Sequence, residues 1–449
     1  MDRRPAHAHA RVRYRREHPE RPERPERPER CERPDGPWST IGHASPAISP
    51  PSESTAMTRL HAVLGPPGPV IRWLAATWAA GDAALVLPED APTPARTDIL
   101  DRLRPATLTE LAADASARVR PLPDPRPTAD DVALVVATSG STGTPKGVEL
   151  TEPALTAATD ASLARLAAKD GDRWALALPL HHVAGIAVVR RAWALGTAPV
   201  PTPHRDQLAR VDAEHVALVP TQLARALDDG VDLARFRTIL LGGGAAPADL
   251  LDRARAAGAT LVVSYGMTET AGGCIYDGRP LDGVDVEVGQ DELIRLRGPM
   301  LFRGYRDDPG ATAAAFDGDW FVTGDHGRWR DGRLEVLGRA DEVVVSGGDN
   351  VPLAPVVATL CSHPGVADAA ATGRPDPTWG QALVAIVVPA DPQHPPDLAG
   401  LRAHVREQLP AHHAPQGLAI VDRLPRDHLG KLRKAALDEL AAAATYRSA

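Results

Sequence analysis

Between residues 130 and 270, short hydrophobic runs alternate with segments in which hydrophobic residues recur every three or four positions. The runs predict strands, and the periodic segments predict amphipathic helices. The predicted strands cover 131–138, 173–180, 215–220, 236–243 and 260–266, and two helices between them cover 221–229 and 247–258. Because the runs are hydrophobic at nearly every position, both faces of the strands must be buried. This favours layered, mostly parallel sheets with helices on both sides.

The pattern changes after residue 280, where hydrophobic and polar residues alternate in short segments separated by turn residues. The segments cover 283–288, 292–298, 320–325 and 333–339. Alternation with a period of two is typical of strands with one exposed face. We therefore predict a small antiparallel sheet.

Beyond Gly338 and Arg339 the sequence again mixes strands and helices. We predict strands at 341–347 and 382–390, and helices around 353–361, at 398–409 and at 431–445. The fold class is α/β. We expect a large N-terminal domain over 57–338, a hinge at 339–341, and a small mobile α+β domain over 342–449, which has a normal size for a domain.

Residues 1–56 differ from the rest of the chain, since they contain a charged repeat, ERPERPERPERCERP, followed by a Ser/Pro-rich stretch. Such a composition buries too little apolar surface to offset the entropy of ordering. We expect this extension to be disordered. Translation from Met57 is the alternative to translation from Met1.

Charge and cysteine content exclude several classes of function. The formal net charge of −8 gives no basic surface for nucleic acid or for an anionic membrane. Three cysteines without metal-ligand spacing predict a reduced, cytoplasmic protein with no disulfide framework. Hydrophobic runs stay shorter than the roughly 20 residues of a membrane span, so we expect no membrane insertion.

Lysine is rare in this chain. The 50 Lys and Arg residues include only four lysines, namely Lys146, Lys169, Lys431 and Lys434. Because a compact ammonium and a planar guanidinium are not interchangeable at a phosphate or a reacting centre, each lysine becomes a candidate functional residue.

One of these lysines ends the loop ATSGSTGTPKG at 137–147, which directly follows a predicted buried strand. Glycines and hydroxyl side chains expose backbone N–H groups and donors of the kind that surround a polyphosphate. The loop differs from the P-loop of NTPases, since Pro145 precedes Lys146 and Gly147 follows it. The alternative is a flexible surface loop. We predict a mobile loop in which Lys146 helps to hold phosphates.

The loop resembles the phosphate loop of the adenylate-forming superfamily of acyl-CoA synthetases, luciferases and peptide-synthetase adenylation domains. Further motifs follow in the order of that superfamily: LPLHHVAG at 178–185, LGGGAAP at 241–247, SYGMTET at 264–270, TGD at 323–325, GRADEVVVSGGDN at 338–350 and LPRDHLGK at 424–431. The chain departs from the family pattern at Pro355 and Val357, where two carboxylates are usual, and at Lys434, where arginine is usual.

The resemblance implies an ATP site, with Mg²⁺ as cofactor. Its expected residues are Thr138, Ser139, Gly140, Ser141, Thr142, Gly143 and Lys146 at the phosphates, Gly243, Gly244, Ala245, Tyr265, Gly266 and Met267 around the adenine, and Asp325 and Arg339 at the ribose. Thr268 would donate to the α-phosphate. Glu269 would hold Mg²⁺, which prefers carboxylate and phosphate oxygens. The alternatives are a solvated carboxylate for Glu269 and a turn cap for Asp325.

The resemblance also implies the acyl and thiol sites. His182, Gly185, Thr221 and Gln222 would line the acyl pocket, Asp341 would be the hinge, and Gly347 and Gly348 would lie beside coenzyme A. Lys431 would bridge the substrate carboxylate and the α-phosphate during adenylation. Structural roles are the alternatives: a histidine satisfied within the fold at His182, and a surface lysine at the start of a helix at Lys431.

The expected substrate is a small carboxylic acid. LPLHHVAG lacks the Asp that pairs with the ammonium of an amino acid in relatives, so an α-amino acid is disfavoured. Eighteen residues follow Lys431, too few for a carrier domain, which makes coenzyme A the expected acceptor.

The chain is most similar to the compact o-succinylbenzoate–CoA ligases of menaquinone biosynthesis. Arg190, Arg191, His182, Thr221 and Gln222 are candidates for the second carboxylate of that acid. The open alternatives are a CoA ligase for another aryl or fatty acid, a stand-alone enzyme that loads a separate carrier, and a nucleotide-binding regulator without catalysis. A homo-oligomer also stays open.

Overall fold

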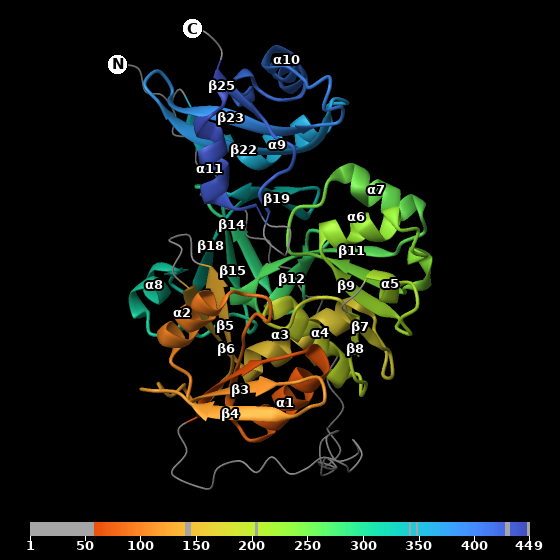
Figure 1. Cartoon of the computed structure of the whole chain (residues 1–449), viewed down its shortest axis with the longest axis vertical. Helices are drawn as coiled ribbons and strands as arrows, with labels where there is room; N and C mark the ends of the chain where they lie inside the picture. The colour runs from red at the N-terminus through yellow and green to blue at the C-terminus, as the bar shows by residue number, and fades with distance from the viewer. Residues whose placement is uncertain are drawn as a thin grey trace, which may run out of the picture.

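The computed structural model describes residues 58–139, 145–202, 205–340, 343–346, 349–426 and 432–446. Most of the chain forms a large body of sheets and helices, and the residues after 340 form a smaller body above it in Figure 1. This matches the α/β architecture predicted from the sequence.

The first sheet of the large body has seven described strands. In spatial order they are β16 (Gly304–Tyr305), β6 (Pro145–Thr151), β5 (Val132–Ser139), β2 (Ala83–Val86), β1 (Leu60–Leu64), β3 (Thr107–Leu111) and β4 (Ala117–Pro121). The inner strands β5, β2, β1 and β3 are parallel, whereas β4, β6 and β16 pair antiparallel with their neighbours. The sheet is therefore mixed.

Strand β6 corrects the prediction that Lys146 lies in a mobile loop. Lys146 is the second residue of β6 and pairs with Thr138 of β5. The phosphate-loop motif thus connects two antiparallel strands of one sheet. Hydrophobic alternation in the short segment KGVELT is too brief to have indicated this strand from the sequence alone.

The second sheet contains the other predicted hydrophobic strands. Its order is β13 (Arg279–Pro280), β12 (Gly272–Tyr276), β11 (Leu261–Met267), β10 (Thr238–Leu241), β9 (His215–Leu218), β7 (Trp174–Leu176) and β8 (Val200–Pro201). From β11 to β8 all neighbours are parallel, whereas β12 pairs antiparallel with both β11 and β13. The predicted strands at 215–220, 236–243 and 260–266 agree closely with these bounds.

Helices cover both faces of the second sheet. Its strands send alternate residues to two cores, since Leu176, Ala217 and Leu240 join one cluster while Val216 and Ile239 join another. The first cluster includes residues of α1 (Pro67–Ala79), α3 (Glu152–Leu166) and α4 (Val183–Ala194), and the second includes residues of α5 (Arg205–Leu208), α6 (Pro220–Asp228) and α7 (Ala248–Ala256). The nearly continuous hydrophobic strands are explained by burial on both sides.

The first cluster also receives one face of the first sheet, so it lies between the two sheets. Leu134 and Val136 of β5 and Val148 and Leu150 of β6 belong to it. The other face of this sheet packs with α2 (Thr93–Leu103) in a separate cluster. The large body is thus layered, with helices between and outside two sheets.

The predicted small antiparallel sheet is present. It consists of β14 (Asp285–Val288), β15 (Leu293–Arg297), β18 (Trp320–Arg330) and β17 (Phe316–Asp317), with β19 (Arg333–Arg339) on β18, and α8 (Pro309–Ala314) precedes β17. Strands β18 and β19 pair from Asp325 and Arg339 at one end to Arg330 and Arg333 at the turn. Asp325 and Arg339 therefore face each other across the ladder.

The smaller body has a sheet of its own. It contains β21 (Asp349–Pro352), β20 (Val343–Ser346), β23 (Gly380–Pro389), β24 (Gly417–Ile420) and β25 (Thr445–Tyr446), with β22 (Val366–Asp376) on β23. Helices α9 (Leu353–Cys361) and α10 (Leu398–Gln408) share one core with it, and α11 (Lys434–Ala442) shares the other. The helices predicted around 353–361 and at 398–409 are confirmed. Val357, at a position where the family usually has a carboxylate, packs against the core of α9 and α10.

The two bodies approach closely where β19 ends. A Cβ on Gly338, which has a φ of +131°, would lie 3.1 Å from Cβ of Ala354 in α9. Glycine tolerates this backbone conformation and this proximity without strain. The chain passes directly from this contact to the segment where the sequence analysis places the hinge.

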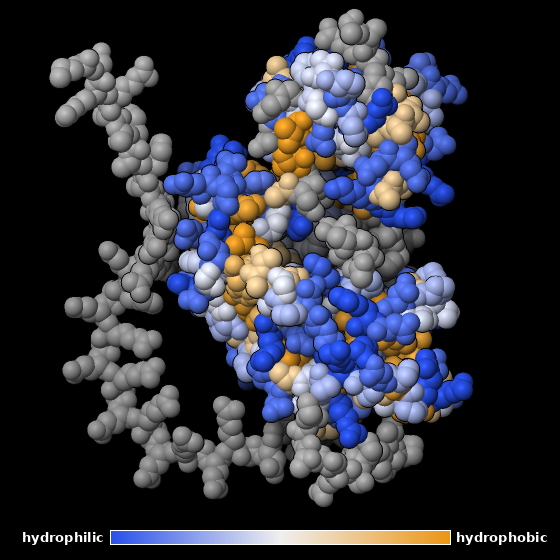
Figure 2. All heavy atoms as spheres, turned by 90° about the vertical axis from the view of Figure 1, so that its left-hand side faces the viewer, coloured by the Kyte–Doolittle hydropathy of each residue, from blue (hydrophilic) through white to orange (hydrophobic). Residues whose placement is uncertain are grey.

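Hydrophilic residues cover most of the face in Figure 2, and hydrophobic residues reach the surface in several places. Among the described residues, the large hydrophobic side chains that are exposed to solvent include those of Val119, Val336, Val345, Trp379 and Ile420. None of the described helices is both long enough and apolar enough to cross a bilayer.

Candidate active site

Several of the described site candidates lie at one edge of the second sheet. Segments carrying them follow the carboxyl ends of β7, β9, β10 and β11, which are parallel neighbours. Carboxyl ends of parallel strands meet at one edge, where ligands of open α/β sheets bind. Residues far apart in sequence are brought together there.

The ribose candidates lie against the end of β11. The Tyr265 hydroxyl donates to Oδ2 of Asp325 at 2.7 Å, and Nη1 of Arg339 lies 3.7 Å from Oδ1 of Asp325. Asp325 is only 8% exposed. Burial and the nearby Asp325 carboxylate raise the pKa of Tyr265 above its usual range, so its phenol stays protonated and donates. Three residues predicted to surround the nucleoside are therefore in contact.

The phosphate and metal candidates lie close together after the end of β11. Glu269 lies in the 3₁₀ turn Thr268–Thr270 that follows β11, and its Oε1 accepts a hydrogen bond from the Tyr305 hydroxyl at 2.9 Å. Nζ of Lys146 lies 5.0 Å from the centroid of the Tyr305 ring. Lys146 and Glu269 are thus joined through Tyr305, which the sequence analysis did not single out, because no pattern signals a strand of two residues.

Thr270 fixes the turn that carries Thr268 and Glu269. Its side chain is fully buried, accepts from the Met267 amide at 2.9 Å and donates to the Gly272 carbonyl at 2.6 Å. The backbone oxygen of Glu269 accepts from the Phe302 amide at 2.8 Å. These bonds fix the backbone of the turn from which the Glu269 side chain extends.

Gly266 permits the bend between β11 and β12. The pairing register shifts between Tyr265 and Gly266, and a Cβ at Gly266 would lie 2.1 Å from the backbone oxygen of Gly272. Any side chain here would push the two strands apart. Glycine is therefore required at this position for packing.

We expect Gly266→Ala to reduce both stability and adenylation, because the added methyl must displace backbone atoms. Overpacking of this kind costs about 1–3 kcal/mol, which a lower melting temperature would report. Gly68→Ala is the control, since a Cβ at Gly68 meets nothing within 4 Å. Equal melting temperatures for both variants would contradict this account.

The acyl-pocket candidates follow β7 and β9. His182 is the N-cap residue of α4, and a Cβ at Gly185 would lie 2.2 Å from the Pro179 oxygen, so α4 begins in close contact with the segment before it. Gln222 accepts from the Val219 amide at 3.0 Å and donates to the Ala177 oxygen at 2.8 Å. The Gln222 amide thus fixes the start of α6 against the end of β7.

Both arginines suggested for a second carboxylate lie in the C-terminal half of α4. Arg190 donates to both carboxylate oxygens of Glu152, and Arg191 is 4% exposed and donates to Ser162 at 2.8 Å and to Tyr276 at 3.3 Å. The rise of a helix places Arg190 about 12 Å along the axis from His182. The described contacts of both arginines lie away from the predicted pocket.

Several predicted site residues lie outside the described residues. These are Gly140, Ser141, Thr142 and Gly143 of the phosphate loop, Asp341, Gly347 and Gly348, and Lys431. The extension at 1–56 also lies outside them.

Among the described candidates, Gly243 lies in the loop after β10. It has a φ of +80°, and a Cβ added to it would lie 3.0 Å from Val219. The loop after β10 therefore lies beside the start of α6.

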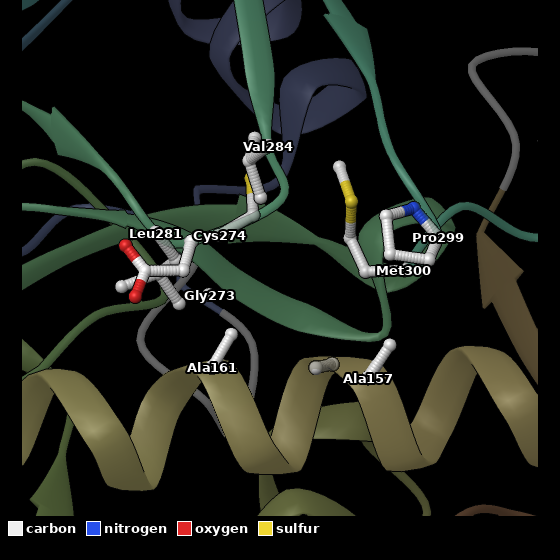
Figure 3. A pocket seen from close by; sticks show the side chains of 10 residues that line it. Ala157, Ala161, Gly273, Cys274, Leu281, Val284, Pro299 and Met300 are labelled. Carbon is white, nitrogen blue, oxygen red and sulfur yellow. The ribbon is translucent and has the colours of Figure 1, made fainter. Parts of the chain in front are cut away.

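A hollow beside α3 is separate from these residues. Figure 3 shows Ala157 and Ala161 directed from the helix toward the side of Met300 and Cys274. None of the residues that line it is a predicted site residue. Burial raises the pKa of Cys274 to about 12, so its thiol is not a nucleophile at neutral pH. We do not assign substrate binding to this hollow.

The donor set fits a magnesium ion held with nucleotide phosphates. Among the described residues no group of three or more His, Cys, Asp or Glu side chains could enclose a metal. Mg²⁺ characteristically uses one or two carboxylates together with phosphates and water. Glu269, with Oε1 engaged by Tyr305, is such a carboxylate.

Comparison with known families agrees with this arrangement. Residues 70–305 match the model of the AMP-binding enzyme family, and residues 358–431 match the model of its C-terminal domain. The chain belongs to the AMP-binding enzyme family. The two matched ranges fall in the large and small bodies of the fold, respectively.

Individual relatives are similar over most of their length. A probable 2-succinylbenzoate–CoA ligase from Mycobacterium tuberculosis is 44% identical over 325 residues, which cover 69% of this chain and 84% of the relative. A 2-succinylbenzoate–CoA ligase from Geobacillus kaustophilus is 36% identical over 343 residues, covering 69% of this chain and 70% of the relative.

A solved structure has the same fold. The o-succinylbenzoate CoA synthetase MenE from Bacillus subtilis, in complex with the acyl-adenylate intermediate OSB-AMP, is 27% identical with a TM-score of 0.75, over 84% of this chain and 88% of that chain. The same enzyme in complex with ATP and a magnesium ion is 26% identical with a TM-score of 0.74, over 86% and 89%.

Proposed function

We propose that this protein is an ATP-dependent ligase that adenylates o-succinylbenzoate and transfers the acyl group to coenzyme A. The observation that carries the proposal is two sets of contacts near the end of β11. Tyr265 donates a hydrogen bond to Asp325, and Tyr305 contacts both Glu269 and Lys146. This constellation offers groups for a ribose, a metal and phosphates at one strand edge. The names of the relatives support the choice of acid.

In the first reaction, the substrate carboxylate attacks the α-phosphorus of ATP and pyrophosphate leaves. The carboxylate is already a nucleophile, so the chain needs no general base, and its contribution is positioning and charge stabilisation. Asp325 and Arg339 would hold the ribose, and Tyr265, whose hydroxyl is fixed by Asp325, would contact the adenine beside Gly243, Gly244 and Ala245.

The phosphates would lie between β11 and the β5–β6 hairpin. Lys146 would bind the β- and γ-phosphates, Thr268 would donate to the α-phosphate, and Glu269 would hold Mg²⁺. When bound, the ion would offset negative charge on the phosphate oxygens. Lys431 would act on the charge that develops at the α-phosphate during attack.

In the second reaction, the coenzyme A thiol, as a thiolate, attacks the acyl carbon and AMP leaves. The proposed rotation of the C-terminal domain (342–449) about Asp341 would remove Lys431 and bring Gly347 and Gly348 toward the thiol. The close packing of Gly338 on Ala354 lies beside this hinge. One active site could then perform two unlike reactions.

The acyl pocket would lie at the ends of β7 and β9. Gln222, Arg190 and Arg191 are engaged by Ala177, Glu152 and Ser162, respectively. His182 and Thr221 are the further candidates for the distal carboxylate of the substrate. Gly185 would permit the close approach of α4 to the pocket wall.

We expect the purified protein, with ATP, Mg²⁺ and coenzyme A, to convert o-succinylbenzoate with a far higher kcat/KM than benzoate, a fatty acid or any amino acid. A buried unpaired ammonium is costly, and LPLHHVAG supplies no carboxylate to pair with it. Thioester formation measured over this panel is the test. A medium-chain fatty acid that surpasses o-succinylbenzoate would replace it as the substrate.

A further inference from the structure

Tyr305 touches two proposed functional groups at once. Its hydroxyl donates to Oε1 of Glu269 at 2.9 Å, and its ring lies under the ammonium of Lys146, 5.0 Å from Nζ to the centroid. We propose that Tyr305 is a positioning residue that fixes the Glu269 carboxylate and the Lys146 ammonium relative to each other. This inference rests on the proposed function, in which these two groups hold the metal and the phosphates.

The register of the first sheet places Tyr305 on the correct face. Tyr305 pairs with Val148, so its side chain shares a face with Val148 and with Lys146, two residues earlier in β6. Arg306 points to the opposite face, where Nη1 contacts Oε1 of Glu149 at 3.1 Å. The strand pairing therefore directs the phenol and the ammonium to the same side.

The neighbours of Tyr305 hold its ring in place. The Tyr305 amide donates to Oγ1 of Thr312 at 2.9 Å, and the Phe302 ring lies 5.0 Å away in an edge arrangement. Arg306 is 4% exposed and donates from Nε to the Leu103 oxygen at 2.8 Å. A phenol anchored on both sides can orient other groups, because it does not move with them.

The chemistry of the contacts explains what the ring would do. A hydroxyl donor on Oε1 prevents free rotation of the Glu269 carboxylate and leaves Oε2 as the oxygen for a metal ion. The face of the ring attracts the ammonium through the cation–π interaction, which keeps Lys146 near Glu269 without a direct ion pair that would compete with phosphate and metal. Groups that orient a metal ligand in this way affect metal affinity strongly.

The test separates the hydroxyl from the ring. Tyr305→Phe removes only the hydroxyl, and Tyr305→Leu removes both. Mn²⁺ replaces Mg²⁺ as a paramagnetic probe, and its affinity for the enzyme with α,β-methylene-ATP is measured by electron paramagnetic resonance. The Mg²⁺ dependence of pyrophosphate exchange and the melting temperature are measured in parallel.

We expect Tyr305→Phe to weaken Mn²⁺ binding about 10-fold, with the melting temperature and the KM for ATP close to those of the unaltered protein. Tyr305→Leu should weaken Mn²⁺ binding similarly and also raise the KM for ATP, because Lys146 loses the ring. Tyr276→Phe is the matched control: it removes a hydroxyl bonded to Ser162 at 2.7 Å, in the core, and should lower the melting temperature without changing Mn²⁺ affinity.

Unaltered Mn²⁺ affinity in Tyr305→Phe would overturn the proposal and leave Tyr305 as a packing residue. Loss of Mn²⁺ affinity only in step with a lower melting temperature, as a general structural defect would produce, would overturn it too. The proposed function fails separately: a protein that binds Mn²⁺ with the ATP analogue but does not turn over o-succinylbenzoate would refute the substrate and preserve the role of Tyr305.

Discussion

Lys431→Ala should reduce kcat for thioester formation by about 10²–10³ with little change in the KM for ATP. A donor aimed at charge that develops only in the transition state affects kcat, and removing one such donor typically has an effect of this size. Steady-state kinetics with o-succinylbenzoate measures it. Lys434→Ala, the same charge removal three residues further on at the start of α11, is the control and should retain most of the activity.

The thiol step should not need Lys431. Supplied with synthetic acyl-adenylate and coenzyme A, the Lys431→Ala variant should form thioester at nearly the normal rate, because adenylation is bypassed. Equal loss in the full and the bypass reactions would show that Lys431 is structural or binds coenzyme A. It would also remove the reason for proposing a rotation of the C-terminal domain.

Asp325→Ala should raise the KM for ATP by at least about 10-fold, since a hydrogen bond to a charged group contributes roughly 1.5–3 kcal/mol and each 1.4 kcal/mol is a factor of ten. The substitution also leaves the Tyr265 hydroxyl without its partner at 2.7 Å, so the melting temperature should fall. ATP-dependent pyrophosphate exchange and thermal unfolding measure the two effects.

Asp325→Asn separates these contributions. Its amide oxygen can still accept from Tyr265, but the charge facing Arg339 is gone. We expect near-normal stability with a KM for ATP that remains elevated. A normal KM in Asp325→Asn and in Asp325→Ala would reduce Asp325 to a structural acceptor for Tyr265.

Local patterns predicted the parts of the fold that depend on local sequence. The strand predicted at 131–138 is β5 at Val132–Ser139, and the helix predicted around 353–361 is α9 at Leu353–Cys361. Hydrophobic runs and helical periodicity predict such elements because each strand or helix must bury its own hydrophobic residues. Strand β7 ends at Leu176, short of the predicted 180, because Leu178 and Leu180 leave the sheet to enter the close turn before α4.

The parts that sequence reasoning missed depend on partners far along the chain. The strand β16 consists of two residues and exists only by pairing with β6, so Tyr305 carried no local signal. Motif resemblance made Gln222 a candidate for the acyl pocket, but it did not indicate that the Gln222 amide contacts Val219 and Ala177. Motif resemblance located Asp325 and Glu269, but not the hydrogen bonds that orient them.

The pairing of β5 with β6 has a consequence for how this protein can change over evolution. Lys146, Val148 and Leu150 are alternate residues of β6, and the latter two are fully buried between the sheets. A slip of one residue would carry Lys146 to the opposite face together with the whole apolar set. Selection that keeps Val148 and Leu150 buried therefore also keeps the Lys146 ammonium on its present face. A deletion of Glu149 would leave every residue of the phosphate-loop motif in the chain, yet it would place Lys146 and Leu150 on opposite faces, so one of them would have to leave the face it now occupies.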